Sequence, residues 1–194
     1  MSKLPKDFYL QDDVVSLSKQ LLGKVLFTKE GNTITAGIIT ETEAYAGTTD
    51  KASHAYGGRR TSRTETMYAM GGVSYVYLCY GLYSLFNVVS NQKDIPHAVL
   101  VRAIKPVEGI KTILERRKTE KLKKGLTTGP GKVAMALGIN FRSHNTLDLT
   151  GSTIWIEERG IIIPEKIINI GQRIGVDYAG EDAKLPYRFW VDKL

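Results

Sequence analysis

The spacing of apolar residues changes from a helical to an extended period within the first 45 residues of the chain. Between residues 12 and 22, apolar side chains recur every three or four positions, which predicts an amphipathic helix. Asp12 or Asp13 can cap the first turn of this helix, and Gly23 can end it. The apolar residues on its inner face are Val14, Leu17 and Leu21.

A β-hairpin is predicted directly after this helix. Residues 24–28 and 33–45 have the composition of strands, and a short turn at 29–32 separates them. The turn contains Gly31 and Asn32, two residue types that tolerate the positive φ of tight turns.

Further strands and helices are interleaved along the rest of the chain. Residues 74–90 predict two strands around a tight turn at Tyr80–Gly81. The other predicted elements are a strand at 98–104 that ends near Lys105–Pro106, a basic helix at 108–121, a short helix at 131–138, and strands at 152–158, 165–176 and 187–192. Most links between strands are too short for a crossover. We therefore expect an α+β fold with a mainly antiparallel sheet and flanking helices, in a single domain of residues 1–194.

A long segment at residues 46–73 has little periodicity. It contains five glycines, His54, and the basic cluster of Arg59, Arg60 and Arg63. Loops of this length in a compact domain are usually functional or disordered. The aromatic residues of the segment, together with His54, favour a functional loop.

Charge and cysteine content narrow the class of protein. Lys and Arg together number 27 and Asp and Glu number 20, so the net charge of +7 is compatible with a polyanionic partner. The single cysteine, Cys79, excludes an internal disulfide and is typical of a reducing compartment. No leader-like segment and no apolar run of about 20 residues is present. We expect a cytoplasmic, nucleoid-associated bacterial protein that does not enter the membrane, and the sequence contains no zinc-binding spacing.

Two carboxylates occupy the end of the predicted strand at 33–45. In an extended chain, Glu41, Glu43 and Tyr45 share one face with Ile39, and the two carboxylates lie about 7 Å apart. They could form an acid/base pair. The alternative is an exposed edge strand whose charged side chains face water.

Four tyrosines fall within the nine residues 75–83. Tyr75 and Tyr77 share a strand face, whereas Tyr80 lies at the hairpin tip, where an aromatic side chain is exposed. Such a tip residue could enter a base stack, contact another protein, or pack beneath the long loop. Aromatic residues on strands more often serve as core.

Two polar residues interrupt apolar strands and therefore require partners. Arg102 follows the run AVLV, and pairing with Glu41 or Glu43 would supply a carboxylate. Asn87 lies within LFNVVS, where its amide is either a ligand or a satisfied structural group.

In order and spacing, these segments resemble the alkyladenine (3-methyladenine) DNA glycosylases of the mammalian and Gram-positive bacterial type. The resemblance covers nearly the whole chain and implies a curved sheet with a tyrosine-bearing hairpin that enters DNA. The matching segments are ETEAY (41–45), His54 with AYGGRRTSR (55–63), YVYLCYGLYSLFNVVS (75–90), VLVRAIKP (99–106), TTGPGKVAMALGIN (127–140), RIGVDYAGE (173–181) and PYRFWV (186–191).

The resemblance implies a role for each candidate residue. Glu43 matches the base that activates the attacking water, and Arg102 and the backbone at Ile174 match further ligands of that water. Glu41 is then structural. The base-binding residues would be Tyr45 and Tyr77 as a sandwich around the flipped base, His54 at its edge, Asn87 crowding the 2-amino group of guanine, and Tyr80 intercalated in the duplex.

The implied reaction is monofunctional base excision on double-stranded DNA, without cofactor or metal, by a monomer. Alkylated or deaminated purines of the 3-methyladenine, 7-methylguanine, hypoxanthine and ethenoadenine class are the implied substrates, and a cationic base gains from cation–π stacking. Residues 116–124 and 142–168 depart from the family pattern, as do Leu82 and Leu85 beside the tip, so the preference among lesions stays open.

Three rival functions remain compatible with the residues alone. The basic helix and the tyrosines also suit an RNA-binding or RNA-modifying protein. A non-enzymatic module for damaged DNA would need the same surface without turnover. A carbohydrate hydrolase could use Glu41 and Glu43 as its carboxylate pair.

Overall fold

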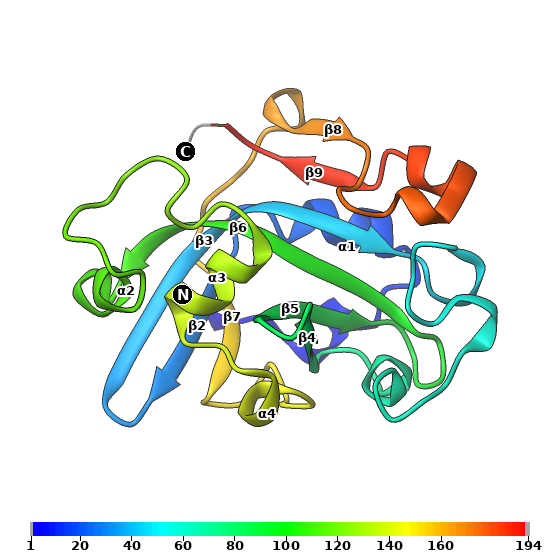
Figure 1. Cartoon of the computed structure of the whole chain (residues 1–194), viewed down its shortest axis with the longest axis horizontal. Coiled ribbons are helices and arrows are strands. Elements are labelled where there is room, and N and C mark those ends of the chain that lie inside the picture. The colour runs from blue at the N-terminus through cyan, green and yellow to red at the C-terminus, as the bar shows by residue number, and fades with distance from the viewer. Residues whose placement is uncertain (1, 193–194) are drawn as a thin grey trace.

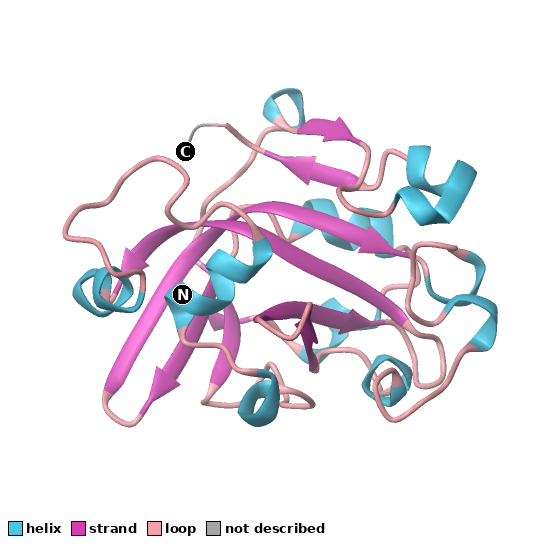
Figure 2. Ribbon diagram, in the orientation of Figure 1, coloured by secondary structure: helices cyan, strands magenta, loops and turns pink. Residues whose placement is uncertain are grey.

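A computed structural model describes residues 2–192, and its strands form one sheet (Figures 1 and 2). The sheet order is β1-β7-β2-β3-β6-β5-β4, with β9 added beside β3 and β8 beside β9, and every strand pairing is antiparallel. The strands are β1 (Ser2–Lys3), β2 (Val25–Glu30), β3 (Thr33–Tyr45), β4 (Ser74–Cys79), β5 (Tyr83–Ser90), β6 (His97–Glu108), β7 (Ile154–Glu158), β8 (Asn169–Gly171) and β9 (Arg188–Trp190). This arrangement confirms the predicted α+β fold with a mainly antiparallel sheet.

The helices are short and lie around the sheet (Figure 2). The α-helices are α1 (Val14–Gln20), α2 (Ile110–Arg116), α3 (Pro130–Leu137) and α4 (Phe141–His144). Short 3₁₀ helices occupy Lys6–Leu10, Gly47–Thr49, Tyr56–Gly58, Glu65–Tyr68, Glu165–Ile167 and Asp177–Lys184. Apolar side chains of α1 and α3 join those of the central strands in the main core cluster. Within residues 2–192, none of the helices has the length and apolar character needed to cross a membrane.

The first helix and hairpin form as the sequence predicts. Asp13 caps α1 because its carboxylate accepts hydrogen bonds from two backbone N–H groups, those of Val15 and Ser16. Gly23 has a φ of 82°, which helps end the helical segment. Strands β2 and β3 are joined by a two-residue turn in which Gly31 has a φ of 57°.

Two of the predicted elements are wrong in extent. Residues 165–176 are not one strand, because only Asn169–Gly171 is extended and the chain then turns at Gly175, with a φ of 76°. Strand β6 continues through Pro106 to Glu108, so α2 is shorter than the helix predicted at 108–121. Pro106 is tolerated because it lies beyond the partners on that edge of β6: β5 pairs only as far as Leu100, and residues 127–129 bond only as far as Ile104.

Two neighbouring bulges interrupt the pairing of β3 with β6. Because of them, the prediction that Ile39 shares a strand face with Glu41, Glu43 and Tyr45 is wrong. Ile39 pairs with Ile104 and Glu41 with Ala103, so Thr40 is an extra residue in β3. The next pair joins Thr42 to Val101, which makes Arg102 the extra residue of β6. As a result, Ile39 belongs to the main core cluster and does not share a face with Glu41, Glu43 and Tyr45.

Candidate active site

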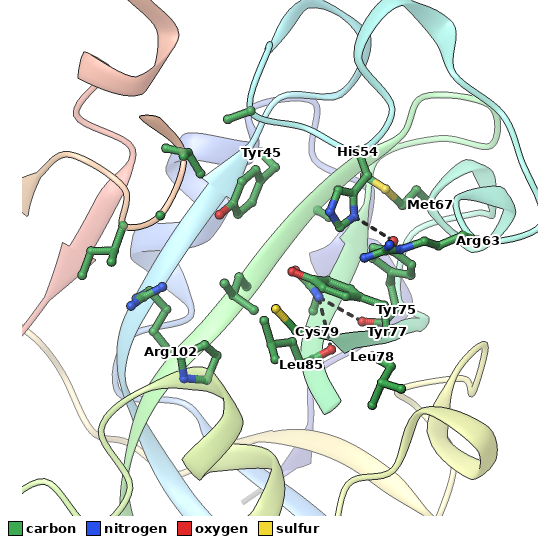
Figure 3. Close-up of a pocket in the computed structure, with 18 of the residues that line it drawn as sticks. Tyr45, His54, Arg63, Met67, Tyr75, Tyr77, Leu78, Cys79, Leu85 and Arg102 are labelled. Carbon is green, nitrogen blue, oxygen red and sulfur yellow. Dashed lines mark hydrogen bonds between the residues drawn. The ribbon is translucent and has the colours of Figure 1, made fainter. Parts of the chain in front are cut away.

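A cavity of about 450 Å³ opens where the ends of β3 and β6 meet the β4–β5 hairpin and the long loop. This volume is typical of small-molecule binding sites. Figure 3 places Tyr45 and Arg102 on one side of the opening, and His54, Tyr75 and Tyr77 on the other. The loop of residues 46–73 therefore forms part of the wall of this cavity.

The Glu43 carboxylate lies behind the cavity wall and is fully buried. Its Oε2 accepts a hydrogen bond of 2.9 Å from the Tyr45 hydroxyl and one of 3.3 Å from Nη1 of Arg102. Its Oε1 accepts a bond of 2.8 Å from the backbone N–H of Ile174. All three donor residues line the cavity, so Glu43 is one side chain away from anything bound there.

Burial raises the pKa of Glu43 above the usual glutamate value, since the charged form loses its hydration. Arg102, the Ile174 N–H and the Tyr45 hydroxyl act in the opposite direction, because each stabilises the carboxylate. Burial also raises the pKa of Tyr45, so its hydroxyl stays protonated and remains a donor. The result is a carboxylate with a pKa displaced toward neutral pH, a property shared by many acid/base groups in enzymes.

Arg102 links Glu43 to Glu41, which lies farther from the cavity. Nε of Arg102 donates to Oε1 of Glu41 at 3.0 Å, and the same oxygen accepts a bond of 2.8 Å from Nε of Arg188 on β9. The sequence offered Glu41 or Glu43 as the carboxylate partner of Arg102, and Arg102 pairs with both.

The aromatic side of the cavity is built from β4 and the long loop. The rings of Tyr75 and Tyr77 lie 5.3 Å apart, and the edge of His54 packs on Tyr77 at 4.7 Å. Nδ1 of His54 is hydrogen-bonded to the Tyr75 hydroxyl at 2.9 Å (Figure 3). Burial, with Arg63 and Arg59 nearby, lowers the pKa of His54 to about 4, so its ring is neutral at pH 7.

Asn87 and Tyr80 complete the set of predicted residues around the cavity. Asn87 is buried on β5, and its Nδ2 donates to the backbone oxygen of Tyr75 at 3.1 Å, while the residue lines the cavity. Tyr80 forms the hairpin tip with a φ of 50°, and 92% of its surface is exposed. A large aromatic residue this exposed has little role in stabilising the fold.

A buried ion pair that sequence reasoning missed holds the loop containing Ile174. Arg173 and Asp50 are both almost fully buried and form a bidentate pair. Arg173 also donates to the backbone oxygens of Ala44 and Asp182. Its guanidinium lies over the Tyr45 ring, 4.9 Å from the centroid. The sequence carried only a weak signal, because Arg173 follows Gln172 in QRIGV and does not follow an apolar run as Arg102 does.

The basic cluster of the long loop separates into residues with different surroundings. Arg60 forms ion pairs with Glu65 and Asp94 on the surface. Arg63 instead lines the cavity, and its guanidinium lies 5.0 Å from the centroid of the Tyr77 ring. The ring of Tyr77 therefore already contacts a cation within the site.

Metal ligands do not gather anywhere in the part of the chain that the structure describes. No group of three or more His, Cys, Asp or Glu side chains there could hold a metal ion. The three histidines are spread over the loop, β6 and α4.

Comparison with known proteins identifies the family of this chain. The family model described as methylpurine-DNA glycosylase matches residues 7–194. A protein of Chlamydia felis named "Putative 3-methyladenine DNA glycosylase" is 48% identical, and the alignment covers 97% of this chain and 96% of that protein. Proteins of the same name from Clostridium acetobutylicum and Desulfitobacterium hafniense are 45% and 41% identical. Their alignments cover 97% and 99% of this chain, and 94% and 96% of the two relatives. The chain therefore belongs to the methylpurine-DNA glycosylase family.

Proposed function

We propose that this protein removes damaged purines from double-stranded DNA by monofunctional hydrolysis, with Glu43 as the base that activates water. The observation that carries the proposal is the Glu43 carboxylate itself. It is buried, held by three donors, and separated from an aromatic cavity only by the residues that hold it. A buried carboxylate with a raised pKa beside a cavity is a candidate acid/base group.

The cavity suits a planar base that has left the duplex. Tyr45 and Tyr77 are the aromatic residues that would stack on its two faces, at a gain of about 1–3 kcal/mol per stacked base. The rings of Tyr45 and Tyr77 would give cationic bases such as 3-methyladenine and 7-methylguanine a cation–π gain, and the Arg63 guanidinium on Tyr77 would have to move away from such a base. The neutral ring of His54 adds no repelling charge at the edge of such a base. Hypoxanthine and ethenoadenine are proposed as further substrates.

Asn87 is the proposed selector against normal guanine. Its Nδ2 is held by the backbone oxygen of Tyr75, which fixes the amide at the cavity wall. A base carrying a 2-amino group would approach this fixed amide, and a side chain that cannot turn away discriminates more strongly than a mobile one.

For a cationic base, the chemical step needs one proton acceptor and one nucleophile, whereas a neutral base such as hypoxanthine must also take a proton from a separate acid. Glu43 takes a proton from water as the oxygen forms a bond to C1′ of the sugar, and the bond from C1′ to the purine nitrogen breaks with its electron pair leaving on the base. The negative charge of Glu43 also stabilises the oxocarbenium-like sugar. Arg102 and the backbone of Ile174 are proposed to orient both the carboxylate and the water.

The hairpin tip is the proposed contact with the distorted duplex. Tyr80 would enter the gap left by the flipped nucleotide and slow its return, at a site where unstacking costs a few kcal/mol. One chain contains the whole cavity, the proposed proton acceptor Glu43 and the proposed intercalating residue Tyr80. We therefore propose that the protein acts on DNA as a monomer.

The test is a base-release assay on duplexes that carry hypoxanthine or 3-methyladenine. We expect the enzyme to release the free base and to leave an abasic site in the DNA. Excess EDTA should not reduce this activity, and borohydride should trap no adduct between enzyme and DNA. Binding to RNA without base release would contradict the proposal, and a trapped adduct would replace the water mechanism by a Schiff-base mechanism.

A further inference from the structure

A single carboxylate oxygen of Glu41 accepts hydrogen bonds from two arginines. Its Oε1 accepts one hydrogen bond from Nε of Arg102 and another from Nε of Arg188, at 3.0 and 2.8 Å. The three residues come from the adjacent strands β6, β3 and β9, and Glu41 is only 8% exposed. A buried carboxylate with two charge-assisted bonds is held in a well-defined position.

Arg102 needs such an anchor because it is the extra residue of a bulge. A bulge residue lies outside the regular pairing of the two strands, so the ladder alone does not fix its side chain. The guanidinium is planar, and the position of its Nε determines where its Nη atoms lie. With Nε fixed on Glu41, Nη1 reaches Oε2 of Glu43 at 3.3 Å.

Glu41 does not itself reach the 450 Å³ cavity. Arg102 lines that cavity, whereas Glu41 lines a separate cleft beside the loop of residues 122–128. A role of Glu41 as acid partner of Glu43 in the reaction therefore has no geometric support, and any effect of Glu41 on the reaction passes through Arg102.

We propose that Glu41 is a positioning residue that, together with Arg188, holds the Arg102 guanidinium in the orientation that serves Glu43. The inference deepens the proposed function and rests on it, because positioning matters for the reaction only if Glu43 is the base. Arg188 extends the anchor to β9, the short strand that pairs with β3 beside the site.

The charged and titratable groups around Glu43 determine how its pKa responds to a change at Glu41. Glu41 and Tyr45 face it from β3, Arg102 from β6, and Arg173 from the loop that also supplies the Ile174 N–H. The negative charge of Glu41 contributes to raising the pKa of Glu43. Neutralising Glu41 should therefore lower that pKa, and the acid limb of the rate profile should move to lower pH.

Substitution of Glu41 by glutamine or by aspartate separates the effect of the acceptor's position from the effect of its negative charge. Glu41→Gln keeps one carbonyl oxygen, which is enough because both arginines bind the same atom. Glu41→Asp keeps the charge but withdraws the acceptor by one methylene. Glu41→Ala removes both. Glu157→Gln is the matched control, because Glu157 is also an ion-paired glutamate of a strand but lies on β7, away from the cavity.

The experiment measures single-turnover base release from a hypoxanthine duplex across pH, with duplex binding measured in parallel. We expect Glu41→Gln to keep the plateau rate constant within about threefold and to shift the acid limb downward. Glu41→Asp and Glu41→Ala should lower the plateau by roughly 10- to 100-fold, the usual effect of losing an oriented charge-assisted bond, with duplex binding unchanged. Glu157→Gln should match the wild type.

A second readout does not depend on turnover. In ¹⁵N–¹H spectra of the arginine side chains, the Nε–H signal of Arg102, assigned through its loss in Arg102→Lys, should be protected from exchange in the wild type and in Glu41→Gln. Protection should be lost in Glu41→Asp. A wild-type rate and a protected Nε–H in Glu41→Asp would overturn the inference. Full activity of Glu43→Gln would instead overturn the proposed function, while the Nε–H signal would still report whether Glu41 holds Arg102.

Discussion

The hydroxyl of Tyr45 donates a 2.9 Å hydrogen bond to Oε2 of Glu43, two residues earlier on the same strand. Residues two apart on a strand share a face, so the two side chains point in the same direction. Tyr45 lines the cavity, and Glu43 lies behind it. Tyr45 therefore has two separable parts in the proposed reaction. Its ring stacks on the base, and its hydroxyl stabilises the ionised carboxylate.

Tyr45→Phe removes the hydroxyl and keeps the ring. Because the hydroxyl lowers the pKa of Glu43, its loss should raise that pKa further, and the acid limb of the pH–rate profile should move to higher pH. Since Glu43 must be ionised to act as a base, the rate on the acid limb should fall by about tenfold, the usual effect of losing a hydrogen bond to a charged group, while binding to lesion DNA should change little. Single-turnover rates between pH 5 and 8 provide the measurement. Tyr77→Phe is the control, and an unchanged acid limb in Tyr45→Phe would count against the assigned contact.

Asp50→Asn tests the buried pair with Arg173. The substitution leaves a buried guanidinium without its counter-charge, which typically costs about 3–5 kcal/mol of the free energy of unfolding. Urea unfolding followed by circular dichroism would measure the loss. The exposed ion pair of Arg60 and Glu65 provides a matched comparison. Arg60→Ala should leave the urea midpoint nearly unchanged. Equal midpoints for the wild type and Asp50→Asn would refute a stabilising role for the buried pair.

Tyr80→Ala should leave stability intact and weaken base flipping. The side chain is 92% exposed, so its removal exposes no core, but the wedge that delays return of the nucleotide is lost. We expect slower base release that is reduced but not abolished, and a smaller fluorescence increase from 2-aminopurine placed next to the lesion. Tyr56→Ala, which changes another exposed tyrosine away from the cavity wall, should behave as the wild type. Identical fluorescence changes in both variants would remove Tyr80 from its proposed role.

His54 should titrate near pH 4 in the folded protein, as followed by its ring resonances in NMR spectra. The sign of the linked stability change follows from the lowered pKa. As pH falls below the unfolded value of about 6.5, the unfolded chain binds the proton first, so the folded state loses stability. His54→Gln should therefore lose less stability than the wild type between pH 7 and 5. Titration near pH 6.5 would contradict the burial of this ring against Tyr75 and Tyr77.

The local pattern of the chain predicted elements whose causes are local. The cap at Asp13, the stop at Gly23 and the turn at Gly31 each depend on a few adjacent residues. The requirement that Arg102 find a carboxylate was also readable, because an arginine after an apolar run is costly to bury alone. The resemblance of whole segments then placed the candidate residues around one site.

What the sequence did not reveal depends on contacts between distant segments. The bulges at Thr40 and Arg102 exist only in the pairing of two strands, and they moved Ile39 to the other face of the sheet. Arg173 falls within the strand predicted at 165–176, but it turns inward to Asp50, more than 120 residues earlier in the chain. Neither partner carries a local signal that identifies the other.

The identity of Glu43 as the base is the central claim, and Glu43→Gln tests it most directly. The amide cannot take a proton from water, yet it keeps the shape of the side chain and leaves the stacking residues in place. In a single-turnover assay on a hypoxanthine duplex, we predict near-total loss of base release, with binding to the same duplex retained. Release at the wild-type rate by a folded, DNA-binding Glu43→Gln variant would contradict the account.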